Sequence, residues 1–440
     1  MADIKKTLCD KAWNYPVVNF YNNEVSMCCH AHHQKIQEKD INHYGKDIFT
    51  KFKPLKDAKL DLLNGVETSN CTYCWYLEKK GIKSSRSAFK DSEKYFKDSG
   101  VILDNLTDDK KQDIIDISTP KLIEISVGNT CDLKCFYCNS IFSSQWASEN
   151  FKFGEPFKDG KGKDTVTNKM EQAWWDWFNS GIYNDINSIG IIGGEPLIID
   201  KTYEYIPKIL EKCKSRNAGW PIVLSIVTNL NAPEIYFNKF LELIPEIINN
   251  PNIILDLSVS IESLNNRAEF IRTGLRWERF EKNLHKILEV TKESNSKIHL
   301  SFMTAISALC ISDFPNFINW VVNLQEKFDI PINLRGSQVV FPNWLSPTML
   351  TEDYIPYIIK AKELINSKKL RDDCYRHGTW TNYSSMLDEV IKGILYPTKS
   401  LENRKIFVEK INLLSSRRNL DFKNTFPEMV DFYERCNNEL

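Results

Sequence analysis

The sequence predicts an α/β protein built on a parallel sheet that curves into a partial, six-stranded barrel. From about residue 120 onward, short apolar runs alternate with segments of helical periodicity, which is typical of repeated β-α-β units. Six such units are too few to close an eight-stranded barrel, so we expect an open one. Three parts follow from this pattern: a cysteine-rich region at 1–118, the barrel at 119–340 and a mainly helical extension packed on it at 341–440.

The six expected strands are short runs rich in β-branched and other apolar residues. They span 121–127, 188–192, 222–227, 253–260, 297–304 and 332–340. Apolar residues spaced three and four positions apart predict helices at 139–149, 202–213, 234–248, 277–293, 313–328, 352–367 and 402–416. Right-handed connections would bring the carboxyl ends of all six strands to one edge, where such barrels carry their chemistry.

Composition excludes several classes of protein. The 440 residues contain 57 Lys and Arg against 58 Asp and Glu, and this net charge of −1 argues against a basic nucleic-acid binder. There is no run of about 18 apolar residues and no apolar N-terminal stretch, so we expect a cytoplasmic protein without a membrane span. In a reducing compartment, clusters among the 12 cysteines indicate metal or redox chemistry before disulfides.

Three of the cysteines directly follow the first expected strand. They are Cys131, Cys135 and Cys138. Three thiolates this close together can bind three irons of a [4Fe–4S] cluster and leave the fourth iron open to a small molecule. A structural zinc site would need a fourth ligand, and no other Cys or His lies nearby in the sequence. The spacing therefore predicts an iron–sulfur site.

Together with later segments, this loop resembles the radical S-adenosylmethionine (SAM) superfamily. The matching residues are, in order, Cys131-Asp-Leu-Lys-Cys135-Phe-Tyr-Cys138, Gly193-Gly194-Glu195-Pro196, Thr228-Asn229 and Ser260-Ile-Glu262. The last three segments stand at the ends of expected strands, and the match covers about residues 119–340. The resemblance implies an enzyme in which the open iron binds the amino and carboxylate groups of SAM. A 5′-deoxyadenosyl radical then takes a hydrogen atom from the substrate.

The resemblance also assigns residues to SAM. They are Tyr137, Gly193, Gly194, Glu195, Asn229, Ser260, Glu262 and Arg272. The two glycines would let the main chain approach the methionine moiety, because glycine has no Cβ. Glu195 would accept from the amino group of SAM, and Tyr137 would lie against the adenine. Ser260 and Glu262 would lie near the ribose or the carboxylate.

Three of these assignments have plainer alternatives. Arg272 would bind the methionine carboxylate as a bidentate donor, or it is a surface charge with little energetic weight. Ser260 and Asn229 would contact SAM, or they simply cap the ends of their strands. A buried Arg272 would not be a surface charge.

A second set of four cysteines resembles the auxiliary-cluster domain called twitch, the smaller form of the SPASM domain. They are Cys9, Cys28, Cys71 and Cys74. Four thiolates can enclose a second [4Fe–4S] cluster completely. Asn23 stands where the family has glycine, and asparagine is the next-best residue for a left-handed turn. No cysteine occurs between Cys74 and Cys131, so the resemblance implies one auxiliary cluster and not two.

The order of the parts differs from the familiar arrangement, in which the twitch follows the barrel. The segment from Cys71 to Arg86 and the triplet Phe426-Pro427-Glu428 resemble a group of twitch proteins that share the order found here. The resemblance therefore extends over most of the chain.

Neighbouring residues leave the ligands of the N-terminal site open. Cys29 adjoins Cys28 and would be the ligand instead, although the spacing from Asn23 favours Cys28. A zinc site built from Cys and His is the alternative to a cluster, because three histidines crowd the same stretch. They are His30, His32 and His33.

Two further groups of residues are expected to be structural. An aromatic run resembles a cofactor box, but its helical setting favours packing in the core. This run consists of Trp174, Trp175, Trp177 and Phe178. Isolated cysteines are usually buried small hydrophobes, and these are Cys213, Cys310, Cys374 and Cys436. A reactive role for Cys310 or Cys374 is the less favoured alternative.

These inferences converge on a radical SAM enzyme with an auxiliary [4Fe–4S] cluster. A fully cysteine-ligated cluster suits an oxidative outcome, in which it accepts an electron from a substrate radical. A reductase or flavodoxin-type protein would supply the electron for SAM cleavage. The substrate is either a peptide side chain, as in SPASM and twitch families, or a sugar- or nucleotide-like small molecule. The lack of an evident winged-helix leader-binding domain slightly favours the small molecule, and a metal-binding protein without turnover is a remote third alternative.

Overall fold

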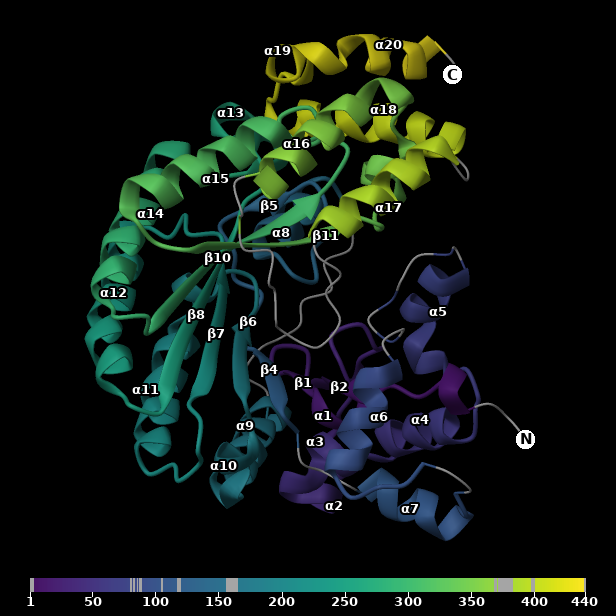
Figure 1. Cartoon of the computed structure of the whole chain (residues 1–440), viewed down its shortest axis with the longest axis vertical. Coiled ribbons are helices and arrows are strands. Elements are labelled where there is room, and N and C mark those ends of the chain that lie inside the picture. Colours follow the sequence, from purple (N-terminus) through teal and green to yellow (C-terminus); the bar gives the residue numbers. More distant parts are fainter. Residues whose placement is uncertain are drawn as a thin grey trace.

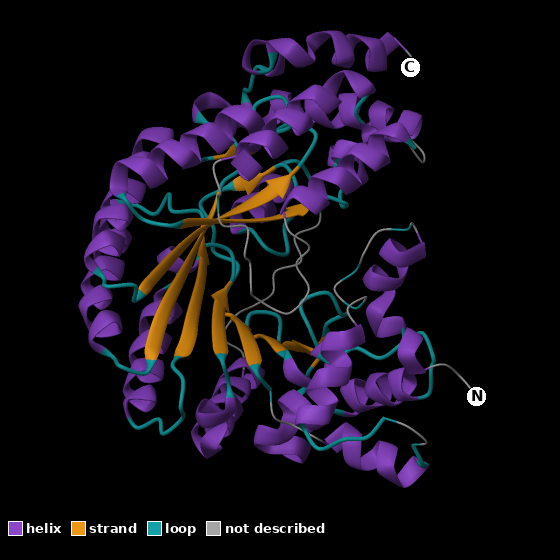
Figure 2. Cartoon of the chain, in the orientation of Figure 1, coloured by secondary structure: helices purple, strands orange, loops and turns teal. Residues whose placement is uncertain are grey.

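A nine-stranded sheet forms the centre of the molecule, and helices surround it (Figure 2). The computed structural model describes residues 4–79, 81, 84, 86, 89–103, 106–116, 120–155, 165–367, 370, 383–396 and 400–438. Cys374 lies outside these residues. None of the helices in the described part is both long and apolar enough to cross a bilayer.

Six neighbouring strands that follow residue 120 are parallel to one another. They are β4 (Leu122–Ser126), β6 (Ser188–Ile192), β7 (Ile222–Thr228), β8 (Ile253–Ser260), β10 (Ile298–Ile306) and β11 (Ile332–Gln338). They are the six strands expected from the sequence, with ends that differ by at most two residues. The α/β class with a large parallel sheet is therefore confirmed. Strand β11 lies at one edge of the sheet, and the sheet does not close on itself through strand pairing. The curvature of a partial barrel stays a prediction.

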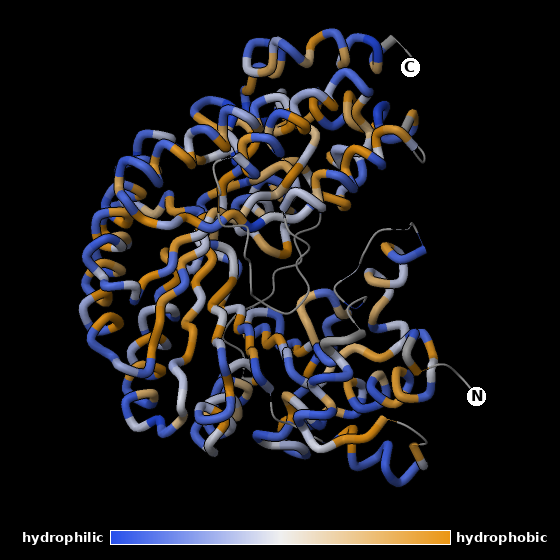
Figure 3. Tube along the Cα trace, in the orientation of Figure 1, coloured by the Kyte–Doolittle hydropathy of each residue, from blue (hydrophilic) through white to orange (hydrophobic). Residues whose placement is uncertain are grey.

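Four amphipathic helices follow four of the strands and cover the outer face of the sheet (Figure 1). They are α11 (Asp200–Lys214), α12 (Glu234–Asn249), α14 (Trp277–Glu293) and α15 (Phe314–Phe328). Apolar side chains of the strands and of these helices are almost completely buried between the two layers, and the strands stand out as apolar segments in Figure 3. Short elements complete this part of the chain, namely β5 (Lys134–Cys135), β9 (Arg272–Thr273), α10 (Tyr183–Asp185) and α13 (Asn265–Ile271).

The first helix after β4 begins later than the sequence predicts. Helix α8 spans Ser144–Lys152, whereas the apolar pattern suggested a start at 139. The reason is an N-cap, because the hydroxyl of Ser143 accepts from the main-chain N–H of Trp146 at 3.2 Å. The same hydroxyl donates to the carbonyl of Leu133 at 2.7 Å. The cap is therefore also tied to the segment after β4 that carries Cys131, Cys135 and Cys138 (the cysteine loop).

The N-terminal region continues the central sheet instead of forming a sheet of its own. Strand β1 (Val17–Asn19) pairs in parallel with β4, and β2 (Glu24–Ser26) and β3 (Gln34–Lys35) add antiparallel strands at this edge. Seven helices surround these strands: α1 (Lys11–Asn14), α2 (Glu38–Tyr44), α3 (Ile48–Lys51), α4 (Lys53–Leu63), α5 (Thr72–Lys79), α6 (Phe89–Asp98) and α7 (Asp108–Asp116). The boundary near 118 therefore separates two segments of one sheet.

The aromatic run expected in the core packs between the N-terminal region and the sheet. Helix α9 (Thr165–Trp177) carries Trp174, which is fully buried, and contacts α2. The ring of Trp174 packs edge-on against Phe20 and Phe49, with centroids 6.2 and 6.0 Å apart. Aromatic edge-to-face pairs of this kind join the two parts into one hydrophobic core.

The C-terminal extension is helical and lies at the β11 end of the sheet, at the top of Figure 1. Its helices are α16 (Ile355–Ser367), α17 (Tyr383–Leu395), α18 (Ser400–Arg418), α19 (Phe422–Thr425) and α20 (Val430–Asn438). Helix α16 packs on α15, and α17 packs on β11. Glu428 accepts from both terminal nitrogens of Arg267 at 2.6 and 2.8 Å, which ties the extension to α13.

Candidate active site

The three cysteines after β4 lie on one loop at the carboxyl edge of the parallel strands. Cys135 is buried, whereas Cys131 and Cys138 are partly exposed. Burial raises the pKa of all three thiols, that of Cys135 to about 12. Cys135 also interacts electrostatically with Cys131 and with Cys138, so the thiols that the sequence groups are grouped in space.

The donor set suits an iron–sulfur cluster better than a single ion. In the described part of the chain, no three His, Cys, Asp or Glu side chains are placed to hold one metal ion. A [4Fe–4S] cluster makes a different demand, because each thiolate binds a different iron and the sulfurs need not converge on one point. Three soft thiols on one short loop meet that demand.

The Gly-Gly segment after β6 is pressed against the cysteine loop. A Cβ on Gly193 would lie 2.6 Å from the carbonyl oxygen of Gly128, and one on Gly194 would overlap the carbonyls of Asn129 and Thr130. Gly194 donates its N–H to Gly128 at 2.8 Å. Glycine is therefore required here so that two segments of the main chain can pack against each other. This reason for the glycines does not depend on the expected approach of SAM.

Glu195 braces the ends of two neighbouring strands. Its buried carboxylate accepts from the hydroxyl of Thr228 and the N–H of Asn229, both at 2.6 Å, and from the N–H of Leu197 at 3.0 Å. Burial, with a contribution from Asp132, raises the pKa of Glu195 to about 7. The expected acceptor of the SAM amino group is thus already bound by three donors of the protein.

Two asparagines after β7 hold the cysteine loop by its aspartate. The side-chain amide of Asn229 donates to Asp132 Oδ1 at 2.8 Å, and that of Asn231 donates to Oδ2 at 2.7 Å. Sequence reasoning missed Asp132 and Asn231 as site residues. The signal was an acidic residue between two cysteines and a second asparagine two positions after Asn229.

Arg272 is buried beneath the same loop, so it is not a surface charge. Strand β9, which it begins, pairs with β5 so that Arg272 lies opposite Cys135. Its Nε and Nη2 donate to the two carboxylate oxygens of Glu262 at 3.1 and 2.6 Å. Its Nη1 lies 3.9 Å from Cys135 Sγ. Arg272 therefore faces a cysteine and a carboxylate of its own chain.

Tyr137 and Ser260 complete the set of residues assigned to SAM. The hydroxyl of Tyr137 donates to Glu262 at 3.1 Å, and the Arg272 guanidinium lies 5.4 Å from the centre of its ring. Burial holds the pKa of Tyr137 well above its usual range, so the hydroxyl is a donor. Ser260 is the last residue of β8 and is partly exposed. All of the assigned residues thus lie at the carboxyl ends of β4, β6, β7 and β8 or on β9.

The structure also brings together the four N-terminal cysteines. All four are buried, and they come from a loop after the first turn of the chain, the segment after β2, the short helix Ser69–Cys71 and helix α5. Cys9 interacts electrostatically with Cys71 and Cys74, and Cys28 interacts with Cys9 and Cys71. Asn23 adopts the left-handed conformation expected of it, with φ of 50°.

Cys29 and the nearby histidines have other partners. Cys29 is exposed and shares a hydrogen bond with Tyr15, which also bonds to Glu124 on β4. The His32 ring nitrogen Nε2 lies 2.5 Å from the hydroxyl of Thr72. His30 stacks on Tyr73, and His33 lies beside Glu24. Cys28 interacts electrostatically with Cys9 and Cys71, and Cys29 also interacts with Cys74, so the choice of Cys28 as the ligand stays a prediction.

The isolated cysteines of the described part are buried. They are Cys213, Cys310 and Cys436. The thiol of Cys310 donates to the carbonyl of Ser307 at 3.2 Å. This burial fits the expected role as small hydrophobes.

Comparison with known proteins gives matches among solved structures alone, since no protein-family model and no curated protein matches the chain. One similar structure is native anSMEcpe with bound AdoMet and a Cp18Cys peptide, at 13% identity and a TM-score of 0.34. Another is a polyhistidine-tagged form of anSMEcpe with bound AdoMet, at 15% identity and a TM-score of 0.36. The matches cover 57% of this chain and 62% and 60% of those chains, or about three fifths of their length. The protein anSMEcpe is an anaerobic sulfatase-maturating enzyme of the radical SAM class.

Proposed function

We propose that this chain is a radical SAM enzyme whose catalytic [4Fe–4S] cluster is held by Cys131, Cys135 and Cys138. One observation carries this proposal. The cysteine loop is fixed at the carboxyl ends of successive parallel strands by residues of the motifs that resemble the family, with Gly194 and Asn229 in direct contact with it. A loop built only for packing would not need three unpaired thiols in this place.

When bound, the cluster and SAM supply reductive cleavage of a C–S bond and a radical that takes a hydrogen atom from the substrate. The chain binds and orients. Its three thiolates would leave one iron free for the methionine end of SAM, and Tyr137 and Ser260 would contact the adenosine. Glu195 would bind the charged amino group most strongly in its ionised form, and because burial raises its pKa to about 7 this role would be sensitive to pH.

We assign a second, auxiliary [4Fe–4S] cluster to Cys9, Cys28, Cys71 and Cys74. The support is the convergence of four buried thiols from four segments of the chain. A cluster ligated by four cysteines has no open iron, so its role is to take up an electron and not to bind the substrate. The expected outcome is oxidation of the substrate, by dehydrogenation or by formation of a crosslink.

Two substrate classes remain in competition. One observation supports a sugar- or nucleotide-like molecule. The N-terminal region is occupied by the cysteines and their supporting helices, where a peptide-modifying enzyme would carry a leader-binding domain. A peptide side chain is favoured by exposed aromatic residues between α5 and the segment after β11. There the rings of Tyr76 and Phe341 lie 5.5 Å apart and both are exposed, as a surface that packs on apolar side chains would be.

The decisive measurement is anaerobic formation of 5′-deoxyadenosine by the reconstituted protein with reductant. A cell extract is divided by ultrafiltration, and each fraction is added in turn. Stimulation by small molecules supports a metabolite dehydrogenase, whereas stimulation by the retained fraction alone supports modification of a peptide or protein. A reductase or flavodoxin-type protein is the proposed physiological donor in either case.

Substitution of the central cysteine tests the proposal itself. We expect Cys135→Ala to abolish 5′-deoxyadenosine formation and to remove about four irons per chain, because the other cluster keeps its own ligands. The matched control is Cys213→Ala, on the far helix α11, which should keep both iron and cleavage. Cleavage of SAM that persists in Cys135→Ala would contradict the assignment of the catalytic cluster to these cysteines. A wild-type protein that does not cleave SAM would support the non-catalytic metal-binding alternative.

A further inference from the structure

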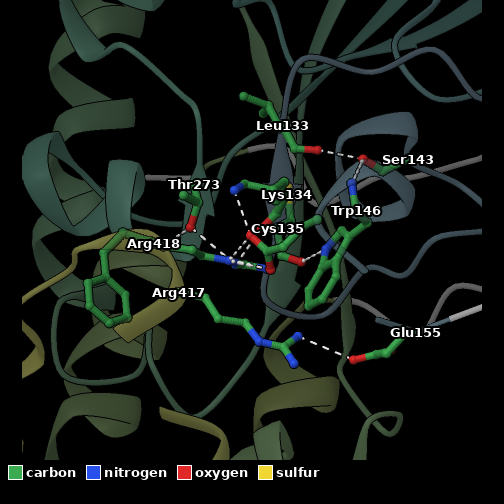
Figure 4. A network of polar contacts seen from close by, with 11 residues as sticks. Leu133, Lys134, Cys135, Ser143, Trp146, Glu155, Thr273, Arg417 and Arg418 are labelled. Atoms are coloured by element: carbon green, nitrogen blue, oxygen red, sulfur yellow. Dashed lines mark hydrogen bonds and ion pairs between the residues drawn. The ribbon is translucent and has the colours of Figure 1, made fainter. Parts of the chain in front are cut away.

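An arginine from the end of the chain is buried against the cysteine loop. Arg418 is the last residue of α18, and its side chain is 0% exposed. Its Nη1 donates to the carbonyl oxygen of Lys134 at 2.8 Å and to the hydroxyl of Thr273 at 3.3 Å. Figure 4 shows Arg418 directed at the Lys134–Cys135 segment. The C-terminal extension thus reaches β5, which carries the middle of the loop, and β9, which pairs with it.

Aromatic rings enclose this guanidinium on two sides. It lies 4.3 Å from the ring centre of Trp146 and 5.0 Å from that of Phe136. The indole N–H of Trp146 donates to the carbonyl of Cys135 at 2.8 Å, so the residue stacked on Arg418 also holds the cysteine main chain. Stacking of this kind is a property of the planar guanidinium that lysine does not reproduce.

The charges around Arg418 do not cancel. Glu149, whose side chain is 4% exposed, accepts from Arg418 Nη2 at 3.0 Å and from Lys134 Nζ at 2.6 Å. Two cations therefore share one carboxylate, so this group of three side chains carries one net positive charge, while Asp132 on the loop is an acidic neighbour of Cys135. Arg418 interacts electrostatically with Cys135. The charge of Arg272, the other arginine near Cys135, is matched by Glu262.

We infer that Arg418 is a positioning residue of the iron–sulfur site, which fixes the Lys134–Cys135 main chain and supplies the positive charge that makes the bound cluster easier to reduce. This inference rests on the proposed function. Reduction adds one electron from the donor protein to the cluster and makes it more negative, and a nearby buried cation stabilises that state. The C-terminal extension is then a part of the redox site and not only a cover for the sheet.

The test is an EPR-monitored redox titration of the reconstituted protein with both clusters. The open cluster is distinguished by the change that added SAM causes in its signal. We expect Arg418→Gln to lower the midpoint potential of this cluster, with about a tenfold fall in the equilibrium constant for reduction, or about 59 mV for one electron. The control is Arg435→Gln in α20, which removes an arginine with a 57% exposed side chain and should leave the potential unchanged.

A second variant separates charge from packing. Glu149→Gln removes the carboxylate shared by Arg418 and Lys134, so we expect the potential to rise. A structural role alone would shift both variants in one direction or shift neither, and either result would overturn the inference. If Arg418→Gln does not fold, Glu149→Gln still decides the sign, and Arg418→Lys should keep a potential near that of the wild type. A wild-type protein without a SAM-sensitive cluster would overturn the proposed function as well, whereas unchanged potentials would overturn the inference alone.

Discussion

The two sets of cysteines differ in how the chain brings them together. Cys131, Cys135 and Cys138 stand on one short loop that is fixed from several sides by Gly194, Asn229 and other main-chain and side-chain contacts. The N-terminal cysteines come from separate segments, and helices and turns of modest length connect them. We expect the first site to keep its shape without a metal, and the proposed auxiliary cluster to strengthen the contacts between the segments of the second. Metal binding should therefore contribute more to folding in the N-terminal region than in the core.

The strongest way to break this comparison is to spoil the preformed loop. We expect Gly194→Ala to reduce 5′-deoxyadenosine formation at least about a hundredfold, because the added methyl group would overlap the carbonyls of Asn129 and Thr130 and displace the loop from reacting geometry. The matched control is Gly219→Ala, whose Cβ would meet no atom within 4 Å. Equal activity of the two variants would show that the contact between Gly194 and the loop is dispensable.

Removal of iron compares the two sites directly. After anaerobic chelation, we expect amide hydrogen exchange to accelerate by about tenfold or more in the segments around Cys28 and Cys71. Around Cys135 we expect a smaller change, because hydrogen bonds to Asp132 and to the loop carbonyls persist without metal. Exchange measured by mass spectrometry on the loaded and stripped proteins checks this. A larger increase in exchange at the cysteine loop than around Cys28 and Cys71 would show that the core site, and not the N-terminal site, depends more on metal.

The buried carboxylate of Glu195 should make the stability of the core depend on pH. The pKa of Glu195 is raised by burial to about 7, so the folded state holds a proton that the unfolded state releases near the ordinary pKa of a carboxyl group. Stability from this group is therefore present at low pH and is lost as the pH rises towards and through 7. Relative to Glu195→Gln, the wild type should lose about 2 kcal/mol between pH 5 and 8.

Urea unfolding of the metal-free protein at the two pH values measures that difference. Glu211→Gln, on the exposed face of α11, serves as the control for the loss of one carboxylate. A difference between wild type and Glu195→Gln that does not change with pH would contradict the assigned brace.

The smallest expected effect concerns the turn that places Cys28. Asn23 has a φ of 50° and accepts from the hydroxyl of Thr167 at 2.9 Å. Asn23→Ala should lower the free energy of unfolding by about 1–2 kcal/mol, through left-handed strain and the lost hydrogen bond. Asn23→Gly should cost less, since glycine tolerates this conformation. Thermal unfolding of the three proteins ranks them, and a less stable glycine variant would show that the hydrogen bond outweighs the turn.

Local patterns in the sequence were sufficient for the six strands between residues 120 and 340 and for seven helices, but the strands and helices of the N-terminal region were not predicted. The strands 188–192 and 253–260 were predicted to the residue, because continuous apolar runs between turn residues have few other solutions. The start of α8 was misplaced, because a capping contact at Ser143 outweighed an apolar pattern that began at 139. Curvature of the sheet has no local signal at all.

Contacts between distant segments account for what the sequence left out. The sequence around Arg418 does not predict its contact with Lys134 of the cysteine loop, which lies 284 residues earlier in the chain. The Gly-Gly segment was correctly singled out as a place of close approach, but the neighbour found there is the chain's own loop. The pairing of β1 with β4 was also missed, since three-residue strands are too short to show a period.

The pairing of β1 with β4 has a consequence for the order of events during synthesis. Strand β1 leaves the ribosome roughly 100 residues before its partner, which at about 5–20 residues per second is a delay of about 5–20 seconds. In the later part of that interval all four N-terminal thiols have been made, but strand β4, on which β1 will pair, does not yet exist. We therefore expect these thiols to be more open to oxidation in the nascent chain than in the folded protein, where all four are buried.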